Sequence, residues 1–277
     1  MAAKIYICVF TVQQEWDRDP LGTLEKIKEM GYEGVEIGLD FEDSVFEAIK
    51  NKLAELGMAA VGSHINLDEA VARADFYFDR MRQMNMKYLG IPWLSDDCLP
   101  GGSRYAETKA KIRYMAERCK LEGFTYQYHN HNFEFEKING VCKLDILLQD
   151  IPELIMQLDV CWCTVGGQDP AAYIRHYGRR MPVLHIKDFS AKTDVSGAKL
   201  FELLGKNDGA DAEQTRGDAG FKFEPVGMGQ VDMPAVFKAA DEVGVVWMGV
   251  EQDASTDRPP MDAARLSYEY IKKTYLK

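Results

Sequence analysis

Three late segments of the sequence each follow an apolar run with a side chain that can bind a metal ion. Asp159 ends LIMQLD, His185 lies in PVLHIKD, and Glu251 lies in VVWMGVEQD. A carboxylate or imidazole at such a position is costly to bury unless it has a partner. A salt bridge or a helix cap would explain any one of these residues, but together they suit a divalent cation that accepts oxygen and nitrogen ligands. The recurrence therefore predicts a metal site.

A fourth segment, residues 128–136 with the sequence YHNHNFEFE, is the richest in polar groups. It holds His129 and His131, two of the five histidines of the chain, with Asn130 between them. On a strand the two histidines would share one face and Asn130 would lie on the other. We expect Glu134 to supply the fourth ligand, because a third carboxylate balances the charge of a hard divalent ion. Either histidine could ligate instead, with Glu134 positioning it.

These candidate ligands lie in a chain where short β-rich runs alternate with longer segments of helical spacing. The runs cover residues 4–11, 34–38, 58–66, 88–94, 124–131, 154–162, 182–189 and 245–253. Strands that alternate with helices pair in parallel, with each helix as the crossover. Eight such units in 277 residues predict an α/β fold with one domain over residues 1–277, a closed (β/α)8 or TIM barrel.

Residues 190–229 interrupt the alternation with a long connection rich in Gly, Asp, Ala and Lys. A connection of this length is unusual in a compact fold and often carries function. We predict a loop insertion here. It acts either as a lid or substrate-binding loop, or as a surface excursion packed on the barrel rim.

In a TIM barrel the active site lies at the carboxyl ends of the strands, so residues at the other strand ends are candidates as well. Glu36 is expected to bind substrate or to hold His64. His64 either hydrogen-bonds a substrate hydroxyl or simply packs at its strand end. Trp93 is expected to form an apolar wall for a substrate ring. Lys187 lies two residues after His185 and would bring positive charge to a developing oxyanion, unless it serves only in a salt bridge.

Composition and charge narrow the class of protein. With 46% hydrophobic and 28% charged residues the chain is typical of soluble globular proteins, and its net charge of -11 argues against a nucleic-acid partner. No apolar stretch reaches the roughly 18 residues that span a bilayer, and the N-terminus lacks a signal-peptide pattern. Cys161 and Cys163, expected on one strand, are poorly placed for a disulfide. We therefore expect a cytoplasmic protein without a membrane partner. A homo-oligomer is compatible with the sequence.

The motifs YHNHNFEF, LDVCW, LHIKD, VGMGQVD and VEQD, in this order and spacing, resemble those of the sugar phosphate isomerase/epimerase family. The resemblance covers essentially the whole chain. These xylose isomerase-like TIM barrels are related to tagatose/psicose epimerases, inosose dehydratases and 3-keto-glycoside-processing enzymes. The resemblance implies one divalent ion held by Glu, Asp, His and Glu, most often Mn2+, with Mg2+, Co2+ or Zn2+ as alternatives.

Asp159, His185 and Glu251 match the last three ligands of that pattern. The first ligand matches less directly, because epimerase-like relatives carry a Glu inside the strand where this chain has Gln127 or Tyr128. Those relatives also carry a substrate-binding His where this chain has Trp162, which argues against a simple ketose 3-epimerase. We expect Trp162 and Asn130 to lie in the substrate-binding site.

The resemblance and the candidate site together imply a metal-dependent isomerase or epimerase that acts on a keto-sugar or polyol. A base, His129 or His131, would remove a proton next to the carbonyl, and the metal would stabilise an enediolate. Lys187 would add electrostatic help, and Glu251 would serve catalysis as well as ligation. A lyase or dehydratase on the same site is the alternative, and a non-catalytic sugar-binding barrel is the rival of another class. The sequence has no clear phosphate-binding loop, which favours an unphosphorylated sugar, inositol or glycoside.

Overall fold

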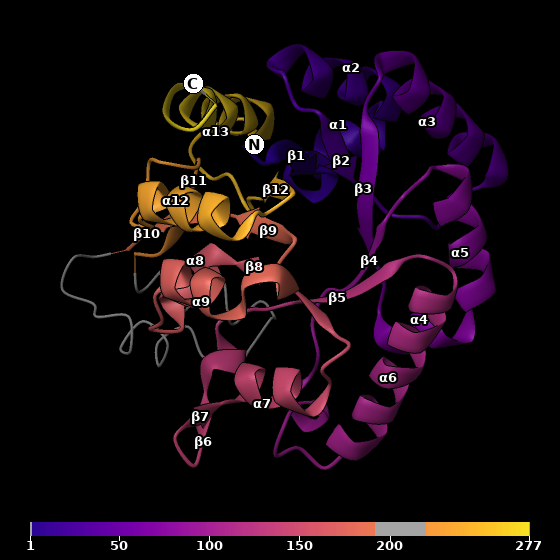
Figure 1. Ribbon diagram of the computed structural model, residues 1–277. Helices are drawn as coiled ribbons and strands as arrows, with labels where there is room; N and C mark the ends of the chain where they lie inside the picture. Colours follow the sequence, from indigo (N-terminus) through magenta and orange to yellow (C-terminus); the bar gives the residue numbers. More distant parts are fainter. Residues whose placement is uncertain (1, 192–219, 277) are drawn as a thin grey trace.

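The computed structural model of the chain describes residues 2–191 and 220–276, and it has a closed barrel of parallel strands at its centre (Figure 1). The barrel strands are β1 (Lys4–Cys8), β2 (Gly34–Glu36), β3 (Ala59–His64), β4 (Tyr88–Ile91), β5 (Thr125–His129), β8 (Ile155–Asp159), β9 (Val183–Ile186) and β12 (Trp247–Val250). They follow one another around the barrel in the order β1-β12-β9-β8-β5-β4-β3-β2. The predicted TIM barrel is confirmed.

Helices surround the barrel and cross from one strand to the next (Figure 1). The α-helices are α1 (Gln13–Arg18), α2 (Pro20–Met30), α3 (Asp43–Leu56), α4 (Leu67–Ala72), α5 (Ala74–Gln83), α6 (Tyr105–Leu121), α7 (Lys143–Asp150), α8 (Val160–Val165), α9 (Pro170–Tyr177), α12 (Met233–Val243) and α13 (Pro260–Thr274). Short 3-10 turns are η1 (Val9–Val12), η2 (Asp96–Cys98), η3 (Phe133–Phe135) and η4 (Gly178–Arg180). No helix in these described ranges is long and apolar enough to cross a membrane.

The chain after Asp159 differs from the expected strand over 154–162. Strand β8 stops at Asp159, and the next six residues form helix α8. The Asp159 carboxylate stabilises the start of this helix, because its Oδ1 atom accepts a hydrogen bond from the backbone N–H of Trp162 at 2.8 Å and so caps the helix. Cys161 and Cys163 therefore lie on a helix, where both are buried free thiols.

Two small antiparallel hairpins lie outside the barrel. One pairs β6 (Lys137–Ile138) with β7 (Val141–Cys142), and the other pairs β10 (Asp188–Ser190) with β11 (Lys222–Glu224). The second hairpin joins the two ends of the predicted 190–229 insertion. Residues 192–219 lie outside the described residues, so the choice between a lid or substrate-binding loop and a surface excursion stays a prediction.

The carboxylate of Asp188 holds the chain beyond β11. Its oxygens accept hydrogen bonds from the backbone N–H groups of Gly227, Gly229 and Val231 at 2.9, 3.0 and 3.1 Å. Only glycine fits at position 229, because a Cβ atom there would lie 2.3 Å from an Asp188 oxygen. The GMGQV sequence is thus a turn folded around a buried carboxylate.

Glycines on two barrel strands make room for large side chains inside the barrel. The Tyr6 hydroxyl on β1 accepts a hydrogen bond from Gln157 on β8 at 3.0 Å, and this contact crosses the interior because β1 and β8 are not neighbours. A Cβ atom on Gly249 would lie 2.2 Å from the Tyr6 ring, and one on Gly90 would lie 2.5 Å from the His64 ring. The missing side chains let Tyr6 and His64 reach the centre of the barrel.

We expect Gly249→Ala to lower the free energy of unfolding by about 1–3 kcal/mol, the usual cost of overpacking a core. The new methyl group would push the Tyr6 ring away from its position. Urea unfolding of the variant against the wild type measures this loss. Gly38→Ala is the matched control, since a Cβ atom there meets nothing within 4 Å. Equal unfolding midpoints for the two variants would contradict the packing described here.

Candidate active site

Four side chains that can ligate a metal ion converge at the carboxyl end of the barrel. They are His129, Asp159, His185 and Glu251, hereafter the ligand group. Each offers one nitrogen or oxygen atom, and these atoms all lie within 4.8 Å of one another. The four side chains come from β5, β8, β9 and the residue after β12, and all are buried. The structure thus brings together the three strand-end residues singled out in the sequence and adds His129.

A cavity of about 660 Å3 opens above the ligand group. Most of the substrate-binding residues expected from the sequence line it, namely Glu36, His64, Trp93 and Trp162, and the candidate bases His129 and His131 line it too. Further aromatic rings from Phe10, Trp16 and Phe41 complete its walls. Apolar walls above a polar floor are typical of a small-molecule site.

Lys187 lies among the carboxylates at the cavity floor. Its ammonium group is 2.7 Å from Glu251 Oε2, 2.8 Å from Asp253 Oδ1 and 3.1 Å from Asp159 Oδ2. Burial alone would lower the pKa of this ammonium, but the three carboxylates raise its pKa well above the ordinary value. Lys187 therefore carries a positive charge that two members of the ligand group share.

The two imidazoles of the ligand group lie in different electrostatic surroundings. Burial lowers the pKa of His129, and the nearby His185 adds to this effect, so His129 is neutral. Burial would also lower the pKa of His185, but Glu36 and Glu251 raise it to about 10. A neutral buried imidazole such as His129 is the form that ligates a metal ion.

The pKa values of two buried acids, Asp159 and Glu36, are also shifted in opposite directions. Burial raises the pKa of Asp159 to about 6 against the opposing effect of Lys187. Burial would raise the pKa of Glu36 as well, but His64 and His185 lower it to about 2. Carboxylates in such contrasting surroundings are frequent at functional sites.

Glu134, the expected fourth ligand, is not brought into the ligand group. Its carboxylate is buried and accepts hydrogen bonds from the Tyr128 hydroxyl at 2.5 Å and from the backbone N–H of His131 at 2.9 Å. Tyr128 alternates with His129 along β5, so its side chain lies on the outer face of the barrel. The group of side chains at ligand spacing contains His129 in place of Glu134, which agrees with the alternative in which a histidine ligates.

Asn130 was expected in the substrate-binding site, but it does not line the cavity. It instead holds the end of strand β5. Its Oδ1 atom accepts a hydrogen bond from the backbone N–H of Asp159 at 3.0 Å, which ties the end of β5 to the end of β8. His131 stacks on Phe133 with an interplanar angle of 3°. Trp162 stacks on Phe221, with ring centroids 6.0 Å apart.

Two site residues did not emerge from the sequence. Gln157 lies two residues before Asp159, and Asp253 lies two residues after Glu251. Along a strand, side chains two residues apart share a face. That alternation was the signal that could have found Gln157, which shares strand β8 with Asp159. Asp253 lies beyond the end of β12 at Val250, so no such signal marks it in the sequence.

The ligand group fits a divalent cation. It offers two imidazole nitrogens and two carboxylate oxygens at ligand spacing, a mixed set suited to Mn2+, Co2+ or Zn2+. A bound cation would share the carboxylates of Asp159 and Glu251 with the Lys187 ammonium. The site thus has the donor atoms that a metal ion requires.

A family model described as xylose isomerase-like TIM barrel matches residues 24–274. The chain belongs to this family. A search of curated proteins gave no match. The family agrees with the resemblance inferred from the sequence motifs.

Solved structures similar to this chain include sugar-processing enzymes. A sugar phosphate isomerase/epimerase from Parabacteroides distasonis is 19% identical with a TM-score of 0.75, covering 99% of this chain and 95% of that one. D-psicose 3-epimerase from Clostridium cellulolyticum, solved with D-tagatose, is 13% identical with a TM-score of 0.68. The match covers 98% of this chain and 99% of that one. A probable 3-DHS dehydratase from Bacillus anthracis is 12% identical with a TM-score of 0.72. The match covers 97% of this chain and 98% of that one. These similarities establish the fold.

Replacing Lys187 with methionine should lower the free energy of unfolding by about 3–5 kcal/mol in a chelator, because the variant leaves buried carboxylates without their counter-charge. Chemical denaturation measures the effect. Lys222→Met is the control, since Lys222 pairs with Glu224 and Asp257 in a half-exposed position and should change stability by less than about 1 kcal/mol. A Lys187→Met protein as stable as the wild type would show that the carboxylates do not depend on this lysine.

Proposed function

We propose that this protein is a metal-dependent isomerase or epimerase that removes a proton next to the carbonyl of a keto-sugar or keto-polyol. The observation that carries the proposal is the ligand group at the floor of a 660 Å3 cavity. His129, Asp159, His185 and Glu251 would hold the cation, with Mn2+ as the proposed ion. When bound, the cation supplies a Lewis acid that polarises a carbonyl oxygen.

Residues of the chain supply the other requirements of the reaction. Of the two candidate bases, His129 belongs to the ligand group and His131 lines the cavity outside it, so we assign proton removal to His131. Return of the proton to the same carbon from the opposite face gives an epimer, and return to the neighbouring carbon gives an isomer. Lys187 adds positive charge at the floor, where negative charge develops on the substrate oxygens.

The cavity lining favours an uncharged sugar over a sugar phosphate. Lys187 is the only lysine or arginine among the described residues that line the cavity, and its ammonium is already paired with Asp159, Glu251 and Asp253. A phosphate group is usually held by cationic side chains or by backbone N–H groups. Aromatic rings and hydroxyl-binding groups instead suit the faces and hydroxyls of a neutral ring.

We expect the purified wild-type protein to hold about one divalent ion per chain after dialysis against Mn2+, and Asp159→Asn to hold almost none. Metal analysis by plasma mass spectrometry checks this. Glu134→Gln is the matched control, because Glu134 is a buried carboxylate outside the ligand group, and it should keep its ion. Loss of the ion in Glu134→Gln would make Glu134 a ligand. A wild type without an ion would contradict the proposed mechanism.

Proton removal is tested by solvent exchange. In D2O the Mn2+-loaded protein should place deuterium next to the carbonyl of one sugar in a panel of ketoses and keto-inositols, as followed by NMR. His131→Gln should slow this exchange by about 10²–10⁴-fold, the usual contribution of a general base. His176→Gln, a change of an exposed histidine on α9, should leave the rate unchanged.

The products of the same reaction distinguish the activities. An epimer or isomer supports the proposal, whereas an unsaturated product would assign a dehydratase or lyase. A sugar that binds without exchanging its proton would indicate a binding protein in place of an enzyme.

A further inference from the structure

The cavity above the ligand group has two unlike sides. The ligand group comes from β5, β8, β9 and the residue after β12, and these strands are neighbours on one side of the closed barrel. The other side consists of β1, β2, β3 and β4. The segments that follow β1, β2 and β4 bring four aromatic rings to the cavity, hereafter the aromatic wall, namely Phe10, Trp16, Phe41 and Trp93.

Two rings of the aromatic wall are open to solvent. Phe10 is 54% exposed and Trp93 is 40% exposed. Phe10 lies in η1, directly after β1, and Trp93 lies two residues after β4, so β2 and β3 separate the strands from which the two rings come. Trp16 and Phe41 contact each other, with ring centroids 6.3 Å apart. Exposed apolar side chains around a concave site are typical of a surface that binds an apolar part of a ligand.

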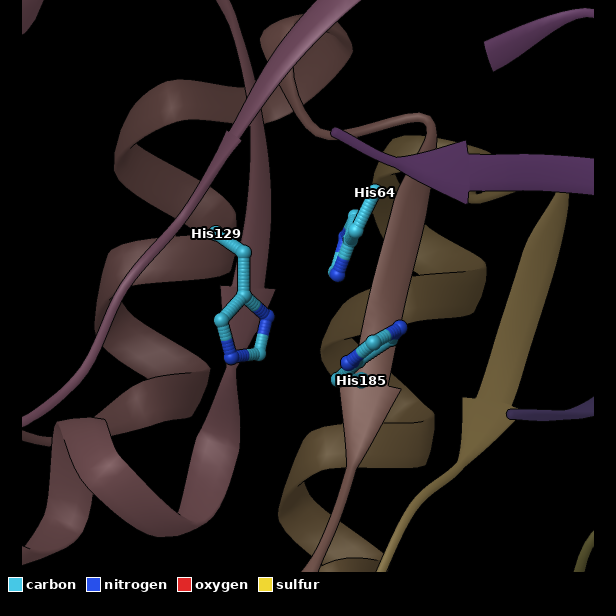
Figure 2. A group of neighbouring side chains, drawn as sticks. All are labelled: His64, His129 and His185. Carbon is cyan, nitrogen blue, oxygen red and sulfur yellow. The ribbon is translucent and has the colours of Figure 1, made fainter. Parts of the chain in front are cut away.

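His64 connects the two sides of the cavity. Figure 2 shows its imidazole extending from β3 toward His129 and His185. The centroid of the His64 ring lies 5.3 Å from that of His129 and 5.5 Å from that of His185, and His64 also lines the cavity. A ligand that occupies both sides of the cavity therefore lies next to His64.

The size and polarity of the cavity indicate what the aromatic wall binds. The volume of about 660 Å3 lies within the range of about 300–1,000 Å3 found for pockets that hold drug-sized molecules, which are larger than one sugar ring. Among the described residues of the β1–β4 side, Gln13, Glu36 and His64 are the only amide, imidazole, hydroxyl or charged side chains that line the cavity. The Gln13 amide already donates to Asp17 at 2.6 Å. A second sugar ring against the aromatic wall would leave hydroxyls without partners, whereas a planar apolar group would not.

We propose that the substrate is an aryl glycoside, a sugar joined to an aromatic group, whose sugar ring lies over the ligand group and whose aromatic group packs against Phe10 and Trp93. The inference rests on the proposed function, because the ligand group determines where the carbonyl of the sugar lies. It makes Phe10 a specificity-determining residue. Trp93, expected from the sequence to form a wall for a substrate ring, contacts the aromatic ring of the substrate.

Calorimetry with pairs of glycosides tests the inference. Each pair is one sugar as its phenyl and its methyl glycoside, and the panel covers common hexoses and pentoses, both as parent sugars and after oxidation of one ring hydroxyl to a ketone. The Mn2+-loaded wild type should bind the phenyl member of at least one pair about 10–100-fold more tightly, the effect of removing one aromatic ring from water. Equal affinities in every pair, or no binding of any phenyl glycoside, would overturn the inference.

Truncation of the two exposed rings tests whether the aromatic wall provides this preference. Phe10→Ala and Trp93→Ala should each weaken binding of the phenyl glycoside by about 2–10-fold, the range for one aromatic pair, and leave binding of the methyl glycoside unchanged. Both side chains are exposed, so we expect both variants to fold. Tyr114→Ala is the matched control, because Tyr114 is 44% exposed on α6 and does not line the cavity. An equal loss for the phenyl and the methyl glycoside would overturn the inference.

Metal content and solvent exchange, measured on the same samples, separate a failure of the inference from a failure of the proposed function. A protein that holds Mn2+ and exchanges the proton of an unsubstituted keto-sugar, but does not prefer phenyl glycosides, would retain the proposed function and lose the inference. A wild type without a bound ion would overturn both. Tighter binding of a disaccharide than of the phenyl glycoside would place a second sugar ring against the aromatic wall and overturn the inference.

Discussion

Negative charge buried at the carboxyl end of the barrel is the constraint on which the site depends. Glu36, Asp159 and Glu251 are all buried there, and several kcal/mol are lost for each buried charge that lacks compensation. Lys187 and His185 lie between these carboxylates and supply the compensating positive charge. A divalent cation bound by the same oxygens would take over the compensation that His185 supplies, since an imidazole ligates a metal ion only in its neutral form.

The barrel supplies the geometry that this arrangement requires. Parallel strands bring their carboxyl ends to one face, so residues far apart in sequence meet there. Glycines inside the barrel let Tyr6 and His64 reach its axis, and the resulting polar layer of Tyr6, Glu36 and Gln157 supports the ligand group from below. Asp159 serves two purposes, because one of its oxygens caps helix α8 while the other faces Lys187. Its position is therefore fixed before any cation binds.

The fold and three members of the ligand group could be predicted from the sequence because apolar runs mark strands and a polar residue marks where each run ends. Helix α8 could not be predicted, since VCW has the composition of a strand and the cap at Asp159 that stabilises the helix becomes visible only in the structure. The spacing of residues in the sequence also could not decide whether His129 or Glu134 belongs to the ligand group. The decision depends on where β5 ends and on which face each side chain lies, and both follow from tertiary structure. The alternation with Asp159 places Gln157 on the inner face of its strand, but its partners Tyr6 and Glu36 lie across the barrel and are known only from the structure.

Anomalous X-ray diffraction from crystals of the protein grown with Mn2+, recorded at a wavelength where manganese scatters anomalously, would locate the cation directly. We expect one anomalous peak within about 2.0–2.3 Å of a nitrogen of His129 and of His185 and of an oxygen of Asp159 and of Glu251. A peak bound to His64 or to Glu134, or crystals without a peak at the cavity floor, would contradict this expectation.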